Sequence, residues 1–331
     1  MIAISDTHFG DRTQMLHDPR LVERFMEALA GRGEVDLLIL LGDIIDLWMK
    51  TTVPALRDAR AFIDGLSQLT NVKGILYIPG NHDYQMFLDA FRLEGDVKIM
   101  QGDLTIPKFT TSRSYGDSVL TGLAHLKSKA HFPMTYPFTT VQVGGRDVVF
   151  THGHHLDFYA TEGWWRTFWL WRHIMKKRKR KATLYDIEMA NIPFCGAMSV
   201  WPWVPELVDE GLRYYHLISF FGRVLHSEKI GESPLRDSLI KENYDEIEQL
   251  LPQLGYPHPA CFVYGHTHRP GMGKLPGTGT VVVNTGCWTR QEEPEVPSRT
   301  WVELDGDVKL MRLGHQGPEI ISSEVLEKKE A

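Results

Sequence analysis

The 331-residue sequence is poor in cysteine, has no long apolar run and carries no excess of positive charge. Its three cysteines, Cys195, Cys261 and Cys287, are far apart, which excludes the paired spacing of a zinc knuckle or a disulfide framework and favours a reducing cytoplasm. No window approaches the ~20 apolar residues of a transmembrane helix, and the first residues resemble a strand rather than a secretory signal. The formal net charge of −6 disfavours a protein that coats nucleic acid through its overall charge.

What the sequence does contain is an alternation of short apolar runs with helix-like stretches. The runs have the length of strands and end in polar residues or glycine, as buried strands do. They lie at residues 2–5, 37–41, 75–78, 148–150, 262–264 and 281–283, and late runs follow at 300–304 and 308–313. Helices are predicted over residues 19–29 and 54–69, because each stretch opens with a proline, which the first turn of a helix tolerates. The predicted class is therefore α/β.

The alternation is interrupted between residues 156 and 257, where aromatic and charged residues recur with helical spacing. We interpret this stretch as a helical cap inserted into a catalytic core that consists of residues 1–155 and 258–313. Residues 314–331 are polar, and we expect them to form a loose tail.

Residue types that bind metals follow five of the predicted strands. The clusters are Asp6-Thr7-His8, Gly42-Asp43-Ile44-Ile45-Asp46, Gly80-Asn81-His82-Asp83, Thr151-His152-Gly153-His154-His155 and Gly265-His266-Thr267-His268. Alternate residues of a strand point to the same side, so Asp6 and His8 are expected to face one ion together. One such cluster is more often a turn or a polar surface. Five of them at carboxyl ends of strands, where open α/β sheets bind ligands, indicate a shared site.

In this order the clusters resemble the calcineurin-like metallophosphoesterase superfamily, whose motifs are D-x-H, G-D-x-x-D, G-N-H-[DE], H and G-H-x-H. The resemblance covers residues 1–155 and 258–313 and leaves the insertion uncovered. It implies a four-layer α/β/β/α sandwich, in which two sheets pack face to face with helices outside. It also implies a binuclear metal centre.

By position, the resemblance assigns ligands to two metal ions. The first ion would be held by Asp6, His8, Asp43 and His268, and the second by Asp43, Asn81, His152 and His266, with Asp43 as the bridge. Nitrogen and oxygen ligands without thiolates suit Mn, Fe, Zn or Ni, and we expect Mn. His154 and His155 adjoin His152, and either is an alternative to it as a ligand. Two such ions would clamp a phosphoryl group and activate a water for in-line attack.

The resemblance gives the catalytic roles to His82 and Asp46. His82 would support the leaving oxygen, and the carboxylate of Asp46 would orient its imidazole. We also predict that Arg12, Arg269 and His154 contact the substrate, since the planar fork of arginine fits a phosphate. A solvent-exposed surface position is the alternative for each arginine.

The insertion contains an unusual segment, residues 164–181, in which tryptophans are followed by lysines and arginines. Trp164, Trp165, Trp169 and Trp171 precede an unbroken basic run from Lys176 to Lys181. Such a segment suits a helix on an anionic membrane surface that covers a lipid-linked substrate. Packing of the tryptophans against the core and binding of single-stranded nucleic acid are the alternatives. The predicted location is the cytoplasm, with peripheral attachment to the inner membrane face as an option.

Within the superfamily, the chain most resembles the branch of UDP-2,3-diacylglucosamine pyrophosphohydrolases. The resemblance rests on residues 265–270, on residues 284–288 and on the helical insertion, and it implies cleavage of a pyrophosphate. The main form of that enzyme has G-N-R-D where this sequence has Gly80-Asn81-His82-Asp83. We expect a hydrolase of phosphoester or pyrophosphate bonds in a nucleotide-diphosphate-linked or lipid-linked substrate. A nuclease or cyclic-nucleotide phosphodiesterase and a non-catalytic scaffold are the alternatives.

Overall fold

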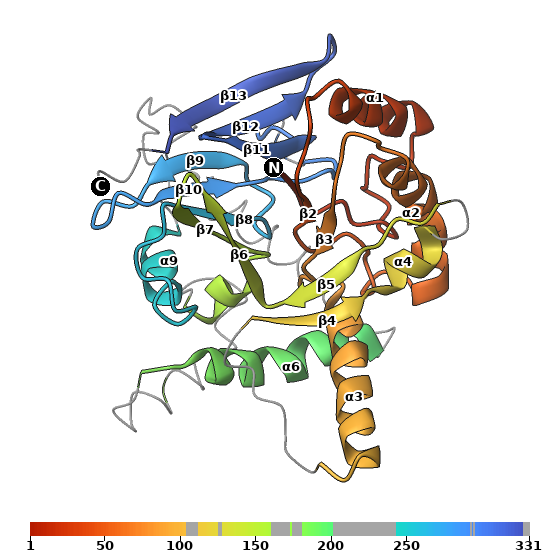
Figure 1. The fold of residues 1–331 in the computed structure, drawn as a ribbon, viewed down its shortest axis with the longest axis vertical. Helices are drawn as coiled ribbons and strands as arrows, with labels where there is room; N and C mark the ends of the chain where they lie inside the picture. Colours follow the sequence, from red (N-terminus) through yellow and green to blue (C-terminus); the bar gives the residue numbers. More distant parts are fainter. Residues whose placement is uncertain are drawn as a thin grey trace, which may run out of the picture.

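A computed structural model describes residues 1–103, 112–124, 128–159, 173, 181–200, 243–291, 293 and 295–326 (Figure 1). Its strands are β1 (Ile2–Ile4), β2 (Leu38–Leu40), β3 (Ile75–Tyr77), β4 (Arg113–Asp117), β5 (Pro133–Tyr136), β6 (Phe138–Val143), β7 (Arg146–Thr151), β8 (Cys261–Tyr264), β9 (Gly271–Lys274), β10 (Val281–Asn284), β11 (Thr300–Asp305), β12 (Asp307–Leu313) and β13 (Pro318–Val325). Its helices are α1 (Pro19–Ala30), α2 (Thr52–Ser67), α3 (Tyr84–Met100), α4 (Val119–Ala124), the 3-10 helix η1 (His154–Phe158), α6 (Leu184–Val200) and α9 (Tyr244–Leu250).

The described strands form two sheets. One has the order β13-β12-β11-β1-β2-β3-β5-β4, and the other has the order β6-β7-β8-β10-β9. Strands β1, β2 and β3 run parallel to one another, as do β7, β8 and β10. In each sheet the segments that follow these parallel strands therefore leave from one edge, which is where the predicted ligand clusters lie.

The alternation of side chains along the strands produces four layers. On β1, Ile2 and Ile4 pack against α1 and α2, whereas Ala3 packs with residues of the second sheet such as Val263. On β8, Phe262 points away from the first sheet and packs against η1, α6 and α9. Figure 1 shows α1 and α2 on one side of the sheets and α9 on the other. The predicted α/β/β/α sandwich is confirmed, and burial of both sheet faces explains the continuous apolar runs.

The predicted strands and the two predicted helices are present, although α2 begins two residues before Pro54. The expectation of a loose tail after residue 314 was wrong for residues 318–325, which form β13 and pair antiparallel with β12. This edge strand has mostly exposed side chains. Backbone hydrogen bonds hold this segment, and they do not depend on apolar side chains. Its polar sequence therefore does not indicate a strand.

The described parts of the predicted insertion are helical. In α6, Leu184 and Ile187 pack with Leu156 of η1 and Ile247 of α9 in one buried cluster. The Trp-rich and basic segment 164–181 lies outside the described residues, apart from residues 173 and 181. Of the helices that are described, none combines the length and the apolar character needed to cross a membrane.

Candidate metal centre

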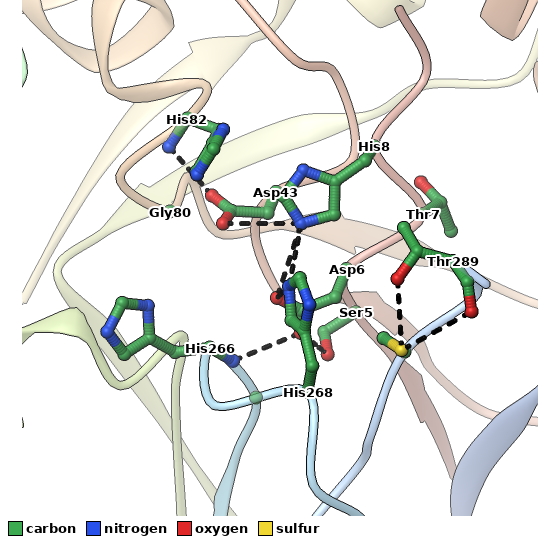
Figure 2. A network of polar contacts seen from close by, with 12 residues as sticks. Ser5, Asp6, Thr7, His8, Asp43, Gly80, His82, His266, His268 and Thr289 are labelled. Carbon is green, nitrogen blue, oxygen red and sulfur yellow. Dashed lines mark hydrogen bonds and ion pairs between the residues drawn. The ribbon is translucent and has the colours of Figure 1, made fainter. Parts of the chain in front are cut away.

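The candidate ligands of the first ion meet although they come from distant parts of the chain. We call Asp6, His8, Asp43 and His268 the first half-site. The Nε2 atom of His8 lies 3.8 Å from Asp6 Oδ1 and 3.8 Å from Asp43 Oδ2. The Nε2 atom of His268 lies 3.2 Å from Asp6 Oδ1 and 2.9 Å from His8 Nε2. Figure 2 shows the rings of His8 and His268 turned toward these carboxylates.

The predicted ligands of the second ion lie on the other side of Asp43. We call Asp43, Asn81, His152 and His266 the second half-site. His152 Nε2 is 3.2 Å from Asp43 Oδ2 and 3.1 Å from Asn81 Oδ1. A nitrogen of His266 lies within 4.8 Å of the ligand atoms of Asp43 and His152. Asp43 Oδ2 thus lies 3.8 Å from His8 Nε2 of the first half-site and 3.2 Å from His152 Nε2 of the second.

Strained backbone brings these side chains together. Six described non-glycine residues have positive φ, and five of them are candidate ligands: Asp6, His8, Asp43, His266 and His268. Such conformations cost about 1–3 kcal/mol each and occur mainly at functional sites. The expectation that strand alternation aligns Asp6 with His8 was wrong, because β1 ends at Ile4 and both residues are in left-handed turns.

The residues fit a cation in the first half-site. Asp6 is fully buried, and its Oδ1 atom accepts no hydrogen bond from the described residues. The Nε2 atoms of His8 and His268 face each other beside it, 2.9 Å apart, where either a proton or a metal ion can lie between the two nitrogens. Carboxylate oxygens and imidazole nitrogens are the donor set of a transition-metal or zinc site. A divalent ion would satisfy all three groups.

The outer nitrogen of each buried candidate imidazole has a partner that orients the ring. His8 Nδ1 lies 2.9 Å from Asp46 Oδ2, and His152 Nδ1 lies 2.8 Å from the carbonyl oxygen of Leu41. With Nδ1–H donating to these oxygens, the lone pair of Nε2 points into the half-sites. His266 is held in the opposite sense, since its Nε2 atom lies 2.7 Å from Asp157 Oδ2, and Nδ1 would be its ligand nitrogen.

The sequence motifs gave no role to two carboxylates that hold the site together, Asp157 and Asp83. Asp157 lies in η1, and no spacing in the sequence links it to His266. Asp83 closes the third motif, where its Oδ2 atom accepts the backbone N–H of Ile44 at 2.9 Å and its Oδ1 atom accepts the N–H of Gly80. Asp83 therefore ties the second motif to the third. Burial, and then the charge of Asp43, raise the pKa of Asp83 to about 6.

The carboxylates dominate the electrostatics of the site. Burial opposes the charged form of Asp43, but the neighbouring His152 and His82 hold the pKa of Asp43 well below its usual range. Burial likewise opposes a charged His152, but Asp43 and Asp6 raise the pKa of His152 to about 9. In protein without metal, His152 therefore binds a proton that a divalent cation would replace.

The predicted catalytic pair sits where solvent reaches the centre. The Nδ1 atom of His82 is 2.9 Å from Asp46 Oδ2, and its ring stacks on Trp48 with centroids 3.9 Å apart. The Oδ1 atom of Asp46 accepts the backbone N–H of Trp48 at 3.0 Å, which fixes this carboxylate. A cavity of about 460 Å³ is lined by His82, Asp46, His8 and His268. His82 therefore faces the space in which a substrate would meet the first half-site.

The three predicted substrate contacts differ in position. Arg269 lines the cavity, with Nη2 at 3.1 Å from Glu293 Oε1. Arg12 is exposed and does not line it. His154 does not line the cavity, since its side chain is buried and its Nε2 atom lies 3.1 Å from the hydroxyl of Tyr136.

Of the three neighbouring histidines in the fourth motif, only His152 faces Asp43. His155 directs Nε2 to Glu188 Oε1 at 2.5 Å, and His154 directs Nε2 to Tyr136. The geometry thus places His152, rather than either alternative, at the second half-site.

The family model for calcineurin-like phosphoesterases matches residues 1–270. The chain belongs to the calcineurin-like phosphoesterase family. No curated protein matches the sequence.

Similar solved structures share little sequence with the chain. A single mutant of Vps29 from Entamoeba histolytica is 10% identical with a TM-score of 0.38, and the alignment covers 98% of this chain and 97% of that one. A predicted phosphoesterase from Streptococcus pneumoniae is 12% identical, with a TM-score of 0.34 and coverage of 98% and 96%. A dimetal phosphatase from Danio rerio is 14% identical, with a TM-score of 0.42 and coverage of 99% and 98%.

Proposed function

We propose that this protein is a binuclear-metal-dependent phosphohydrolase. The observation that carries the proposal is the sharing of Asp43 between two half-sites beside a cavity that also receives His82. Two divalent ions, Mn²⁺ by our expectation, would supply Lewis-acid polarisation of phosphoryl oxygens and lower the pKa of a water. Asp6, His8, Asp43 and His268 would hold one ion, and Asp43, Asn81, His152 and His266 would hold the other.

His82 has the position of a general acid for the leaving oxygen. The carboxylate of Asp46 accepts a hydrogen bond from Nδ1–H of His82, and Trp48 covers one face of the ring. The Nε2 atom is then the nitrogen that can donate a proton to a substrate in the cavity. The same carboxylate also contacts Nδ1 of His8. Asp46 therefore orients both a candidate metal ligand, His8, and the candidate general acid, His82.

The cavity favours a substrate with a second anionic group. Arg269 and Arg290 both line it, on the segments that follow β8 and β10. Guanidinium groups bind phosphate oxygens through paired hydrogen bonds. Within the described part of the chain, Glu293 accepts from one guanidinium nitrogen of Arg269, so the other nitrogens of the fork can make such a contact. A phosphoanhydride, as in a nucleotide-diphosphate-linked substrate, places two phosphates at the required short separation.

We further propose a lipid-linked substrate presented at an anionic membrane. The support is the motif similarity to the UDP-2,3-diacylglucosamine pyrophosphohydrolase branch, together with the tryptophans and basic residues of segment 164–181. Sedimentation with vesicles, with and without anionic lipid, tests this part. Binding that survives neutralisation of Lys176 to Lys181 would contradict it.

The hydrolase proposal is tested with purified full-length protein loaded with Mn²⁺. Metal content is measured first, and hydrolysis is then assayed with a p-nitrophenyl monoester, a p-nitrophenyl diester and a nucleotide-diphosphate sugar. We expect the nucleotide-diphosphate sugar to be cleaved fastest. Absence of hydrolysis with any divalent ion, despite two bound ions, would instead support a non-catalytic scaffold.

The role of His82 has its own test in the same assay. His82→Ala is expected to lower kcat about 10²- to 10⁴-fold, the usual contribution of general acid catalysis, while two ions stay bound. His131→Ala is the matched control, because His131 is exposed and pairs with Asp117 outside the cavity. Equal losses of metal and activity in His82→Ala would make His82 a ligand instead.

A further inference from the structure

A buried carboxylate of the helical insertion lies at the centre of a hydrogen-bond cluster next to the second half-site. Glu188 of α6 is fully buried. Its Oε1 atom lies 2.5 Å from His155 Nε2 and accepts from the hydroxyl group of Tyr136 at 3.0 Å, and its Oε2 atom accepts from the hydroxyl group of Tyr84 at 3.0 Å. We call these four residues the Glu188 cluster. Burying a carboxylate is costly unless such partners satisfy it, so this side chain requires α3, β5, η1 and α6 to keep their relative positions.

The two tyrosines act as donors in this cluster. Burial, followed by the charge of Glu188, raises the pKa of Tyr84 and of Tyr136 well above the ordinary range. Both phenols therefore keep their protons and donate to the carboxylate. The ring of Tyr136 also stacks on Phe87 with centroids 4.0 Å apart, which holds its hydroxyl in place.

The Glu188 cluster is connected to the second half-site through the short helix η1. Its five residues, His154–Phe158, carry His155 toward Glu188 and Asp157 toward His266. Asp157 Oδ2 contacts His266 Nε2 at 2.7 Å and thereby fixes the ring that offers Nδ1 to the ion. Any rotation of η1 that breaks the contact between His155 and Glu188 would also move Asp157.

We propose that Glu188 is a positioning residue for the second metal ion, acting through His155, η1 and Asp157 on the ring of His266. The inference rests on the proposed binuclear centre. It gives α6 a role in assembling that centre.

Apolar packing alone does not account for this arrangement. Leu184 and Ile187 of α6 also pack with Leu156 and Phe158 of η1. Such contacts bring the two helices together but have little directional preference. The hydrogen bonds to Glu188 are directional, so they select the rotation of η1 in which Asp157 meets His266.

The test is a calorimetric Mn²⁺ titration of the full chain. Glu188→Ala is expected to weaken one of the two binding events by about 10- to 100-fold, as loss of an outer-layer partner does, and to leave the other event unchanged. Glu188→Gln is expected to recover most of the lost affinity, because its amide oxygen still accepts from Tyr84 and Tyr136. Asp186→Asn is the matched control: Asp186 is a buried carboxylate of the same helix that accepts the backbone N–H of Thr183 at 2.9 Å.

The control separates positioning from general loss of structure. Asp186→Asn is expected to lower Tm without selecting one Mn²⁺ event. If Glu188→Ala does not fold, Tyr136→Phe removes one donor while keeping the ring on Phe87, and it should weaken the same event by a smaller factor.

Two results would overturn the inference: wild-type affinity for both ions in Glu188→Ala, or equal weakening of both events in proportion to Tm in Glu188→Ala and Asp186→Asn. Wild-type protein that binds two ions but hydrolyses nothing would contradict the proposed function alone.

Discussion

The glycine of the third motif provides the sharpest test of the metal centre, because a methyl group added there collides with candidate ligands. A Cβ atom at Gly80 would lie 2.6 Å from His152 Cδ2 and 2.7 Å from His152 Nε2, and it would overlap Asp43 Oδ1. Real Cβ contacts essentially never fall under 3.0 Å. The φ angle of Gly80 is not in the left-handed region, so alanine is excluded by these side chains alone.

Gly80→Ala must therefore displace the shared carboxylate, the imidazole of His152, or both. Overpacking of this kind costs roughly 1–3 kcal/mol. If the cost falls on the bound state, Mn²⁺ affinity drops about 5- to 150-fold, because each 1.4 kcal/mol is a factor of ten. Both half-sites should lose affinity, since Asp43 belongs to both.

The assay combines a calorimetric Mn²⁺ titration with thermal unfolding of the metal-free protein. Gly95→Ala is the control, because Gly95 lies in α3 with no atom within 4 Å of its added Cβ. Alanine inside a helix stabilises by about 0.5–1 kcal/mol relative to glycine, so this variant should keep its Mn²⁺ affinity and show a slightly raised Tm. Two ions bound to Gly80→Ala with wild-type affinity would refute the assignment of Asp43 and His152 as ligands.

Three further predictions follow from other parts of the structure. Asp157→Asn weakens the hydrogen bond to His266 and should lower the affinity for one Mn²⁺ ion about 10- to 100-fold in the same titration; an unchanged isotherm would contradict the outer-layer role. The pKa of His152 is raised from 6.5 to about 9 in metal-free protein, so its contribution to stability is complete below pH 6.5 and is lost as the pH rises through 9. Urea unfolding of metal-free protein should therefore show a free energy of unfolding that decreases between pH 6.5 and about pH 9. Calorimetry in buffers of different ionisation enthalpy should detect proton release on Mn²⁺ binding. Metal binding without proton release near pH 7 would contradict this prediction. Phe25→Ala removes a fully buried ring whose centroid is 4.5 Å from that of Trp288, and it should lower the free energy of unfolding by about 3–5 kcal/mol, whereas Val53→Ala at an exposed position should change it little; similar urea midpoints for the two variants would contradict the packing argument.

The sequence by itself determined the central strands, the sandwich and the order of the candidate ligands. The runs around Ile39 and Phe262 are continuously apolar because both faces of their sheets are covered. Their burial can therefore be predicted from a few neighbouring residues. The ligand motifs are also local, since each is a few residues long and directly follows its strand. The order and position of these motifs in the sequence therefore predict the site without knowledge of how the strands pack.

The tertiary structure alone decided which groups support those ligands. Asp157 orients His266, Trp48 covers His82, and Glu188 reaches η1 from α6, yet each is a single side chain without a repeating pattern. It also separated Arg269, which lines the cavity, from Arg12, which does not.

The backbone conformation of the site and the last strand, β13, could not be predicted from neighbouring residues either. The left-handed turns at Asp6 and His8 persist because the surrounding packing overdetermines them, and the mild preference of aspartate and histidine for such conformations is too weak to locate them from the sequence. The polar strand β13 forms because β12 offers it an unpaired edge. Periodicity in a sequence indicates which face of a helix or strand is buried. Which residues contact one another in the site depends on how distant segments of the chain pack.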